Sequence, residues 1–183
     1  NTNPGYALEW ARFQESLAVD FLTWQRDLLR PLISPEQQIL HCLIGGHSGE
    51  ASAVREISNA LDHTAVNVYV PLQDSLTLPE PSRAPGLAPS WLPGRGATEL
   101  DFYADMAWSL RGERGESFAV TESQATSIAG HSSNNPPYPG QLRLVAHALL
   151  ARGADLVSYW HWHTLHYGAE TYWGGVLGHD LEP

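Results

Sequence analysis

A glutamate at the end of a short apolar run is the first candidate for chemistry in this sequence. The run begins at Ser117 and ends at Glu122. A strand that is buried on both faces usually stops at a turn, so a carboxylate at its end indicates a functional site. A second run begins at Leu156 and leads into Tyr159, Trp160, His161, Trp162 and His163. We therefore expect two strand ends to face one pocket.

These residue types together indicate a carbohydrate ligand. Flat aromatic faces stack on the C–H face of a pyranose ring, while carboxylates and imidazoles hydrogen-bond to its hydroxyl groups. The chain has seven Trp and seven Tyr, and several of them follow residue 158. A sugar-binding pocket at the strand ends is therefore the first hypothesis.

Histidines after the second run support an alternative hypothesis, a metal site. On a strand, His161 and His163 would point to one face, and His166 or Glu122 would be a third ligand for a zinc ion. The sequence has no His-Glu-x-x-His motif, which accompanies many hydrolytic zinc sites. We therefore predict no metal ligands and no cofactor.

Composition excludes several classes of partner. The chain has 183 residues and a formal net charge of −10, and its pI is near 5.2. Nucleic acid and anionic membranes bind basic surfaces, so neither is expected as a partner. The single cysteine, Cys42, excludes an internal disulfide. We see no signal peptide and no apolar stretch of membrane-spanning length, which predicts a cytoplasmic protein.

Helix and strand patterns alternate along the chain. Apolar residues recur at spacings of three and four from Trp10 to Leu28, which predicts a helix that ends before Pro31. Further helices are expected over residues 50–61, 100–110 and 141–151, and buried strands over residues 39–44, 64–70, 117–122 and from residue 156. Residues 73–96 are rich in Pro and Gly and predict a long loop. Helices between buried strands predict a parallel sheet, which offers ligands the carboxyl ends of its strands.

Several segments resemble glycoside hydrolase family 42, the β-galactosidases. These segments are residues 3–5 with 10–13, 121–124, 137–143, 153–155, 159–162 and 167–175. They include a glutamate at a strand end, a Pro-Gly entry to the next helix, and an aromatic strand exit, in the family's order. The resemblance extends along nearly the whole chain.

The resemblance implies a fold and an activity. The family fold is a (β/α)8 barrel of the TIM type, and its reaction is hydrolysis of terminal β-galactosides with retained anomeric configuration. By resemblance, Glu122 is the nucleophile, and Tyr69 contacts both this residue and the substrate. Trp160 matches an aromatic wall, and Glu170 matches a carboxylate that binds galactose hydroxyl groups.

Two substitutions at family positions bear on sugar preference. Gly130 stands where several relatives have a Trp eight residues after the nucleophile, and His131 follows it. Trp173 stands where a His is expected three residues after Glu170. We expect His131 and Trp173 to contact the substrate in place of the family's residues.

One required group is absent from the sequence. Retaining hydrolysis uses two carboxyl groups, one as nucleophile and one as general acid and base. In the family the second glutamate follows an Asn on an earlier strand, and no Asn-Glu pair occurs here. The four predicted strands make about half a barrel. We therefore expect residues 1–183 to be a single domain that forms the C-terminal part of the barrel and is inactive alone.

The resemblance and the incomplete barrel also predict what the chain binds. A galactoside is the expected substrate, and the open edges of half a barrel predict self-association or pairing with a complementary N-terminal half. The alternative function is a carbohydrate-binding or assembly module, in which the same pocket holds a sugar or a partner chain without chemistry.

Overall fold

The structure is a computed structural model, and it describes residues 3–44, 53–76, 95–110, 117–126 and 136–183. Its order of elements is α1 (Pro4–Leu29), η1 (Arg30–Leu32), β1 (Cys42–Ile44), α2 (Val54–Ala60), β2 (Ala65–Val68), η3 (Gln73–Leu76), α3 (Arg95–Leu110), β3 (Phe118–Gln124), α4 (Gln141–Ala151) and β4 (Ala154–Trp160). His131 and the loop residues 77–94 lie outside the described residues. None of the described helices is long and apolar enough to cross a membrane.

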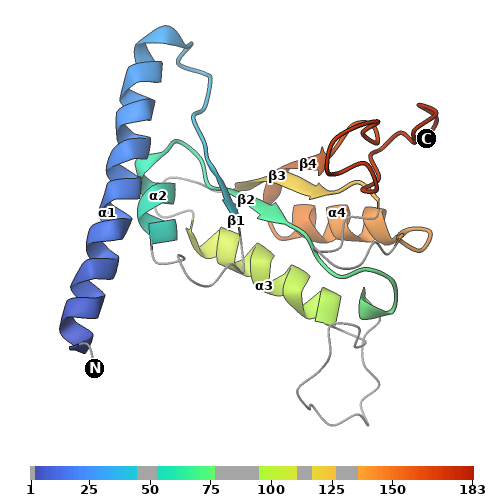
Figure 1. Ribbon diagram of the computed structural model, residues 1–183, viewed down its shortest axis with the longest axis horizontal. Coiled ribbons are helices and arrows are strands. Elements are labelled where there is room, and N and C mark those ends of the chain that lie inside the picture. The colour runs from blue at the N-terminus through green and yellow to red at the C-terminus, as the bar shows by residue number, and fades with distance from the viewer. Residues whose placement is uncertain (1–2, 45–52, 77–94, 111–116, 127–135) are drawn as a thin grey trace.

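The four strands form one sheet in which every neighbouring pair is parallel. Their order is β1-β2-β3-β4, so each strand pairs with the next strand in sequence. Helices α3 and α4 lie along one face of this sheet (Figure 1). Such consecutive parallel pairing, with helices between the strands, is the arrangement of a β/α barrel. It confirms the parallel sheet that the alternating patterns predicted.

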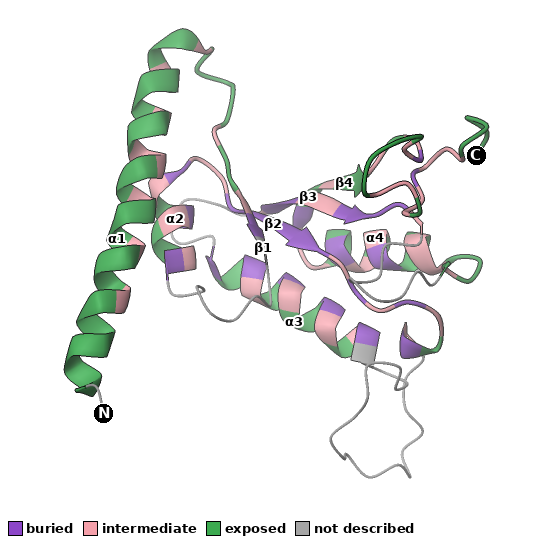
Figure 2. Ribbon diagram, viewed as in Figure 1, coloured by how far each residue is buried: buried purple, intermediate pink, exposed green. Residues whose placement is uncertain are grey.

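The core lies between the sheet and its helix layer. Val66, Val68, Phe118 and Val120 are at most 1% exposed and pack with apolar residues of α3 and α4, which include Ala104 and Leu149. Figure 2 shows the buried residues gathered on β2 and β3 and on the sheet-facing side of α3. Alternate residues of a strand point to opposite faces, so these side chains define the helix face of the sheet. We call the opposite face of the sheet the inner face, and the candidate site lies on it.

Helix α1 begins and ends as the sequence indicates. Asn3 accepts a hydrogen bond from the backbone N–H of Gly5 at 2.8 Å, and Pro4 occupies the first turn. Its apolar residues, however, do not join the core. They form a set that we call the α1 stripe, with each side chain between 50% and 60% exposed: Trp10, Phe13, Leu17, Phe21, Trp24 and Leu28.

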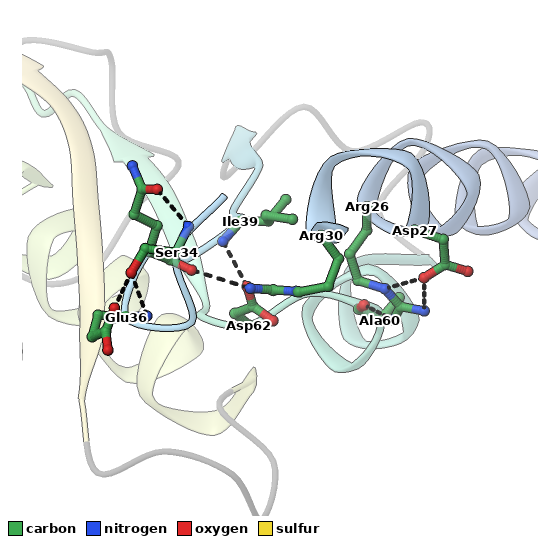
Figure 3. A network of polar contacts seen from close by, with 9 residues as sticks. Arg26, Asp27, Arg30, Ser34, Glu36, Ile39, Ala60 and Asp62 are labelled. Atoms are coloured by element: carbon green, nitrogen blue, oxygen red, sulfur yellow. Dashed lines mark hydrogen bonds and ion pairs between the residues drawn. The ribbon is translucent and has the colours of Figure 1, made fainter. Parts of the chain in front are cut away.

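Polar contacts attach α1 to the rest of the chain. The carboxylate of Asp62 pairs with Arg30 and accepts a hydrogen bond from the backbone N–H of Ile39 at 2.7 Å. Arg26 pairs with Asp27 at 2.7 Å and also donates to the carbonyl group of Ala60 (Figure 3). Helix α1 also contacts α2. The described part of the chain therefore contacts one side of α1 and leaves the α1 stripe uncovered.

Several element boundaries differ from the sequence predictions, and three of the differences matter here. Strand β1 begins at Cys42 rather than at residue 39, and α3 begins at Arg95, inside the segment predicted to be a loop. The third difference concerns Glu122, which was expected to end its strand but lies inside β3. The strand continues because its pairing with β4 extends to Gln124, opposite Trp160. The Gln124 side chain, 0% exposed, also forms hydrogen bonds to the main chain of Val70.

Candidate active site

The site is built on the carboxyl ends of β2, β3 and β4. Asn67 of β2 pairs with Glu122 of β3, and Gln124 of β3 pairs with Trp160 of β4. Partners in neighbouring parallel strands share a face of the sheet, and Val66 and Val68 occupy the helix face. Glu122 and Trp160 therefore both lie on the inner face, at the same end of the sheet.

Glu122 reaches this face through an irregularity in β3. Regular alternation would place it with Phe118 and Val120 on the helix face. Between Val120 and Glu122, however, β3 advances two residues while β2 advances one, so Thr121 is an extra residue. The pairing with β4 shows the same extra residue between Val120 and Ser123. This β-bulge moves Glu122 to the inner face, as bulges beside active sites often do.

Tyr69 donates a hydrogen bond to Glu122. Its hydroxyl oxygen lies 2.9 Å from Oε2 of Glu122, across the gap between β2 and β3. Burial raises the pKa of Tyr69, and the hydrogen bond to Glu122 and the negative charges of Glu122 and Glu170 raise it further. The phenol therefore stays protonated and keeps donating to the carboxylate.

Glu170 belongs to the same neighbourhood. It lies in the segment after β4, and its charge acts on the Tyr69 hydroxyl although 101 positions separate the two in sequence (170 minus 69). The carbonyl oxygen of Glu170 accepts a hydrogen bond from the backbone N–H of Trp173 at 3.1 Å, so a turn brings these two residues together. Tyr69 thus contacts Glu122 directly, and Glu170 is near enough for its charge to raise the pKa of Tyr69.

The segment that carries Glu170 is closed on itself. Thr164, 7% exposed, donates through its hydroxyl to the carbonyl oxygen of Leu177 at 3.0 Å and accepts from the backbone N–H of Gly175 at 2.9 Å. The rings of His166 and His179 also hydrogen-bond to main-chain oxygens of this segment, at 2.8 and 3.0 Å. These contacts fix the loop that presents Glu170 and Trp173.

Two buried side-chain nitrogens after the end of β4 have no partner within the described chain. They are Nε1 of Trp173 and Nε2 of His161. A buried polar atom without a hydrogen bond is unfavourable, so such atoms usually meet a group that the structure lacks. The indole N–H of Trp173 can only donate, so it requires an acceptor. This residue was a candidate by sequence, whereas the atom on His161 was not singled out for sugar binding.

The alternative zinc hypothesis gains no geometric support. Nδ1 of His161 is hydrogen-bonded to the carbonyl oxygen of His163, and Nε2 of His166 to that of His179. Among the described residues, no three His, Cys, Asp or Glu side chains come close enough to hold a metal ion. Strand β4 also ends at Trp160, so His161 and His163 are not on one strand face as the hypothesis required.

Comparison with known proteins identifies the family. The family model described as β-galactosidase, glycoside hydrolase family 42, matches residues 1–183. The chain belongs to glycoside hydrolase family 42.

Individual relatives are consistent with this family. β-Galactosidase BgaH of Haloferax lucentense is 37% identical over 73 residues, which are 40% of this chain and 11% of that protein. β-Galactosidase BgaA of Clostridium cellulovorans is 24% identical over 179 residues, which are 97% of this chain and 24% of that protein. The chain therefore matches 11% of the length of the first of these relatives and about a quarter of the length of the second.

Solved structures show the same fold. The β-galactosidase from the haloarchaeon Halorubrum lacusprofundi superimposes with a TM-score of 0.81 at 24% identity, covering 100% of this chain and 26% of that one. The β-galactosidase from Marinomonas ef1 gives a TM-score of 0.76 at 23% identity, with the same two coverages. The parallel sheet of this chain is thus part of a family 42 barrel of the TIM type, as predicted.

Proposed function

We propose that this chain carries the nucleophile side of a retaining β-galactosidase active site, with Glu122 as the nucleophile. The observation that supports this most strongly is the hydrogen bond from Tyr69 to Glu122 on the inner face. In that position the carboxylate is held by a neutral donor and opens toward the interior of the barrel. Its place at the carboxyl end of a strand agrees with where barrel enzymes hold catalytic groups.

The reaction would proceed in two displacements. Oε1 or Oε2 of Glu122 attacks the anomeric carbon, and the bond from this carbon to the leaving oxygen breaks. A second carboxylic acid protonates that oxygen and then, as a carboxylate, takes a proton from the water that cleaves the glycosyl-enzyme ester. Two inversions return the original anomeric configuration. We assign the second carboxyl group to a part of the barrel outside residues 1–183.

The remaining candidates would bind the sugar. The indole of Trp160, on the inner face, would stack on the galactose ring, and Glu170 would accept hydrogen bonds from its hydroxyl groups. Trp173 would donate through its unpartnered Nε1. We retain His131, which follows the nucleophile strand, as a proposed contact to the substrate.

We further propose that residues 1–183 form one domain that pairs with a complementary barrel half. Strands β1 and β4 are the edges of the four-stranded sheet, and the α1 stripe is uncovered. Free strand edges and exposed apolar faces both favour association. A partner that supplies the missing strands would cover these surfaces and add the second carboxyl group.

Pairing can be tested by sedimentation. We expect residues 1–183 alone to self-associate, and to form a one-to-one complex with the N-terminal barrel half of the H. lacusprofundi enzyme. Trp24→Ser should weaken that complex at least tenfold, because a buried Trp often contributes about 2 kcal/mol or more to an interface. Gln25→Ser is the matched control, since Gln25 is exposed and lies outside the stripe. Equal affinities of the two variants would exclude the stripe from the interface.

The nucleophile can be tested by covalent trapping. In a 2,4-dinitrophenyl 2-deoxy-2-fluoro-β-galactoside, the leaving group departs as a stable anion, so attack by Glu122 needs no second carboxyl group. We expect the mass of residues 1–183, alone or paired, to rise by one fluorogalactosyl group, with the label on the peptide that contains Glu122. Glu122→Gln should remain unlabelled, as should the wild-type chain given the gluco analogue. Galactose binding without a label would instead favour the non-catalytic binding module.

A further inference from the structure

The bulge in β3 is held by a side-chain contact that the proposed chemistry does not use. Thr121, the extra residue, places its hydroxyl oxygen 2.9 Å from Oδ1 of Asn67 and 3.3 Å from the carbonyl oxygen of Val66. The hydroxyl has one proton, so the shorter contact to Asn67 is its main hydrogen bond. Asn67 is 8% exposed and pairs in register with Glu122.

This contact lies at the bulge that determines the face of the sheet on which Glu122 lies. Without the bulge, regular alternation through Thr121 would carry Glu122 with Phe118 and Val120 into the helix layer, where an ionised carboxylate would be desolvated and unpaired. With it, Glu122 shares a face with Tyr69. Bulges locally lose ladder hydrogen bonds, so a polar side chain at the bulge compensates for part of that loss.

We propose that Thr121 and Asn67 form a positioning pair that fixes the β3 bulge and thereby aims Glu122 at the inner face. The pair acts through the position of Glu122, and its role in the reaction rests on the proposed function of Glu122. Thr121 contributes the hydroxyl group, and Asn67 anchors it from the neighbouring strand. A positioning role requires a hydroxyl group at residue 121, whereas general packing would require only the shape of the side chain.

The test compares variants of the pair by the rate of fluorogalactosyl labelling, in residues 1–183 paired with the complementary barrel half. Thr121→Val keeps the branched shape and removes the hydroxyl, and Asn67→Ala removes the acceptor. We expect each to slow labelling by about 100-fold, because a displacement of about 1 Å at a reacting group has an effect of that size. Thr121→Ser restores the hydroxyl and should label at close to the wild-type rate.

A control variant tests whether removing any buried threonine hydroxyl near the end of β3 has the same effect. Oγ1 of Thr126 is buried and has no hydrogen-bond partner within the described residues, so Thr126→Val should leave labelling unchanged. Melting curves on all variants identify any that unfold, and Asn67→Ala decides the matter should Thr121→Val be one of them. Labelling of a folded Thr121→Val chain at the wild-type rate would overturn the proposal.

Crystal structures can test the positioning pair even if Glu122 is not the nucleophile. In that case the wild-type chain would remain unlabelled, which contradicts the proposed function alone. Crystal structures of the wild-type and Thr121→Val chains would then decide. Loss of the Tyr69–Glu122 contact in the variant supports the positioning pair, whereas an unchanged contact and register refute it.

Discussion

The hydroxyl oxygen of Tyr69 lies 2.9 Å from Oε2 of Glu122, and this contact joins the end of β2 to the bulge of β3. It brings together residues 53 positions apart in the sequence. Strand pairing supplies the proximity, since Asn67 is opposite Glu122 and Tyr69 is the second residue after Asn67. The geometry of the site is thus a consequence of the register between two adjacent strands.

Replacing Tyr69 with Phe removes the donor and keeps the ring. A hydrogen bond to a charged group contributes about 1.5–3 kcal/mol, so we expect labelling of Glu122 to slow by about 10- to 100-fold. The pKa of Tyr69 is raised, so the wild-type rate should show no alkaline decline from deprotonation of this phenol. Measuring the labelling rate of both proteins from pH 5 to 10, a range below the ordinary pKa of tyrosine of about 10, checks both expectations. An unchanged rate in Tyr69→Phe would remove Tyr69 from the site.

Gln124 should contribute to stability through its two bonds to Val70. Its Nε2 donates to the Val70 carbonyl oxygen at 2.6 Å, and its Oε1 accepts from the Val70 N–H at 3.3 Å. In Gln124→Met these buried main-chain groups lose their partners, at about 1–3 kcal/mol for each unsatisfied group. Urea denaturation should show the loss. The exposed Gln25→Met, on α1, serves as the control and should unfold at the wild-type midpoint.

Much of this architecture is predictable from the sequence, because local patterns determine it. Helix α4 occupies residues 141–151 as predicted, and the order of strands and helices specifies a parallel sheet. The bulge at Thr121 was not predicted. A signal for it does exist, because Phe118, Val120 and Glu122 have the same parity, and a carboxylate in an apolar series implies a break in alternation.

Other features depend on contacts that no local pattern contains. Strand β3 extends beyond Glu122 by pairing with β4, and the unpartnered Nε1 of Trp173 depends on how the C-terminal loop folds. The α1 stripe is evident as a periodic pattern, but its exposure in the structure depends on what packs beside it. Such long-range packing has no local sequence signature.

Asp155 should make stability depend on pH. It is an extra residue in β4 opposite Phe118 and Ala119, and it accepts hydrogen bonds from Ser117 at 2.7 Å and from His63 at 3.2 Å. Burial raises the pKa of Asp155, but these hydrogen bonds and the charge of His63 outweigh it, so the net pKa is lowered from 3.8. A folded pKa below the unfolded one means that the stabilisation is present above pH 3.8 and disappears as pH falls through the folded value.

The variant Asp155→Asn measures how much the ionised Asp155 carboxylate stabilises the fold. We expect it to melt at a lower temperature than the wild-type chain at pH 7, and the difference to shrink toward zero below the folded pKa. Asp20→Asn, at an exposed position on α1, should show a smaller difference at pH 7. A gap between Asp155→Asn and wild type that stays constant down to pH 2, below the ordinary Asp pKa of about 4, would contradict the role of its charge.

Gly153 should not tolerate a side chain. Its φ is +98°, and an added Cβ would lie 2.2 Å from Cζ3 of Trp108 on α3. Gly153→Ala therefore combines left-handed strain with a clash, and we expect a loss of about 2 kcal/mol or more in the free energy of unfolding. Gly140→Ala isolates the strain, since φ is +90° there and no atom lies within 4 Å of the added Cβ. Equal losses in the two variants would show that the contact with Trp108 is unimportant.

The central claim is that Glu122 attacks the anomeric carbon, and chemical rescue tests it most directly. In the paired barrel, Glu122→Gly removes the nucleophile and leaves room for a small anion to attack the anomeric carbon in its place. With 2,4-dinitrophenyl β-galactoside and azide, we predict that this variant forms α-galactosyl azide, the product of a single inversion. Hydrolysis by Glu122→Gly at the wild-type rate without azide, with β-galactose as the first product, would contradict the account.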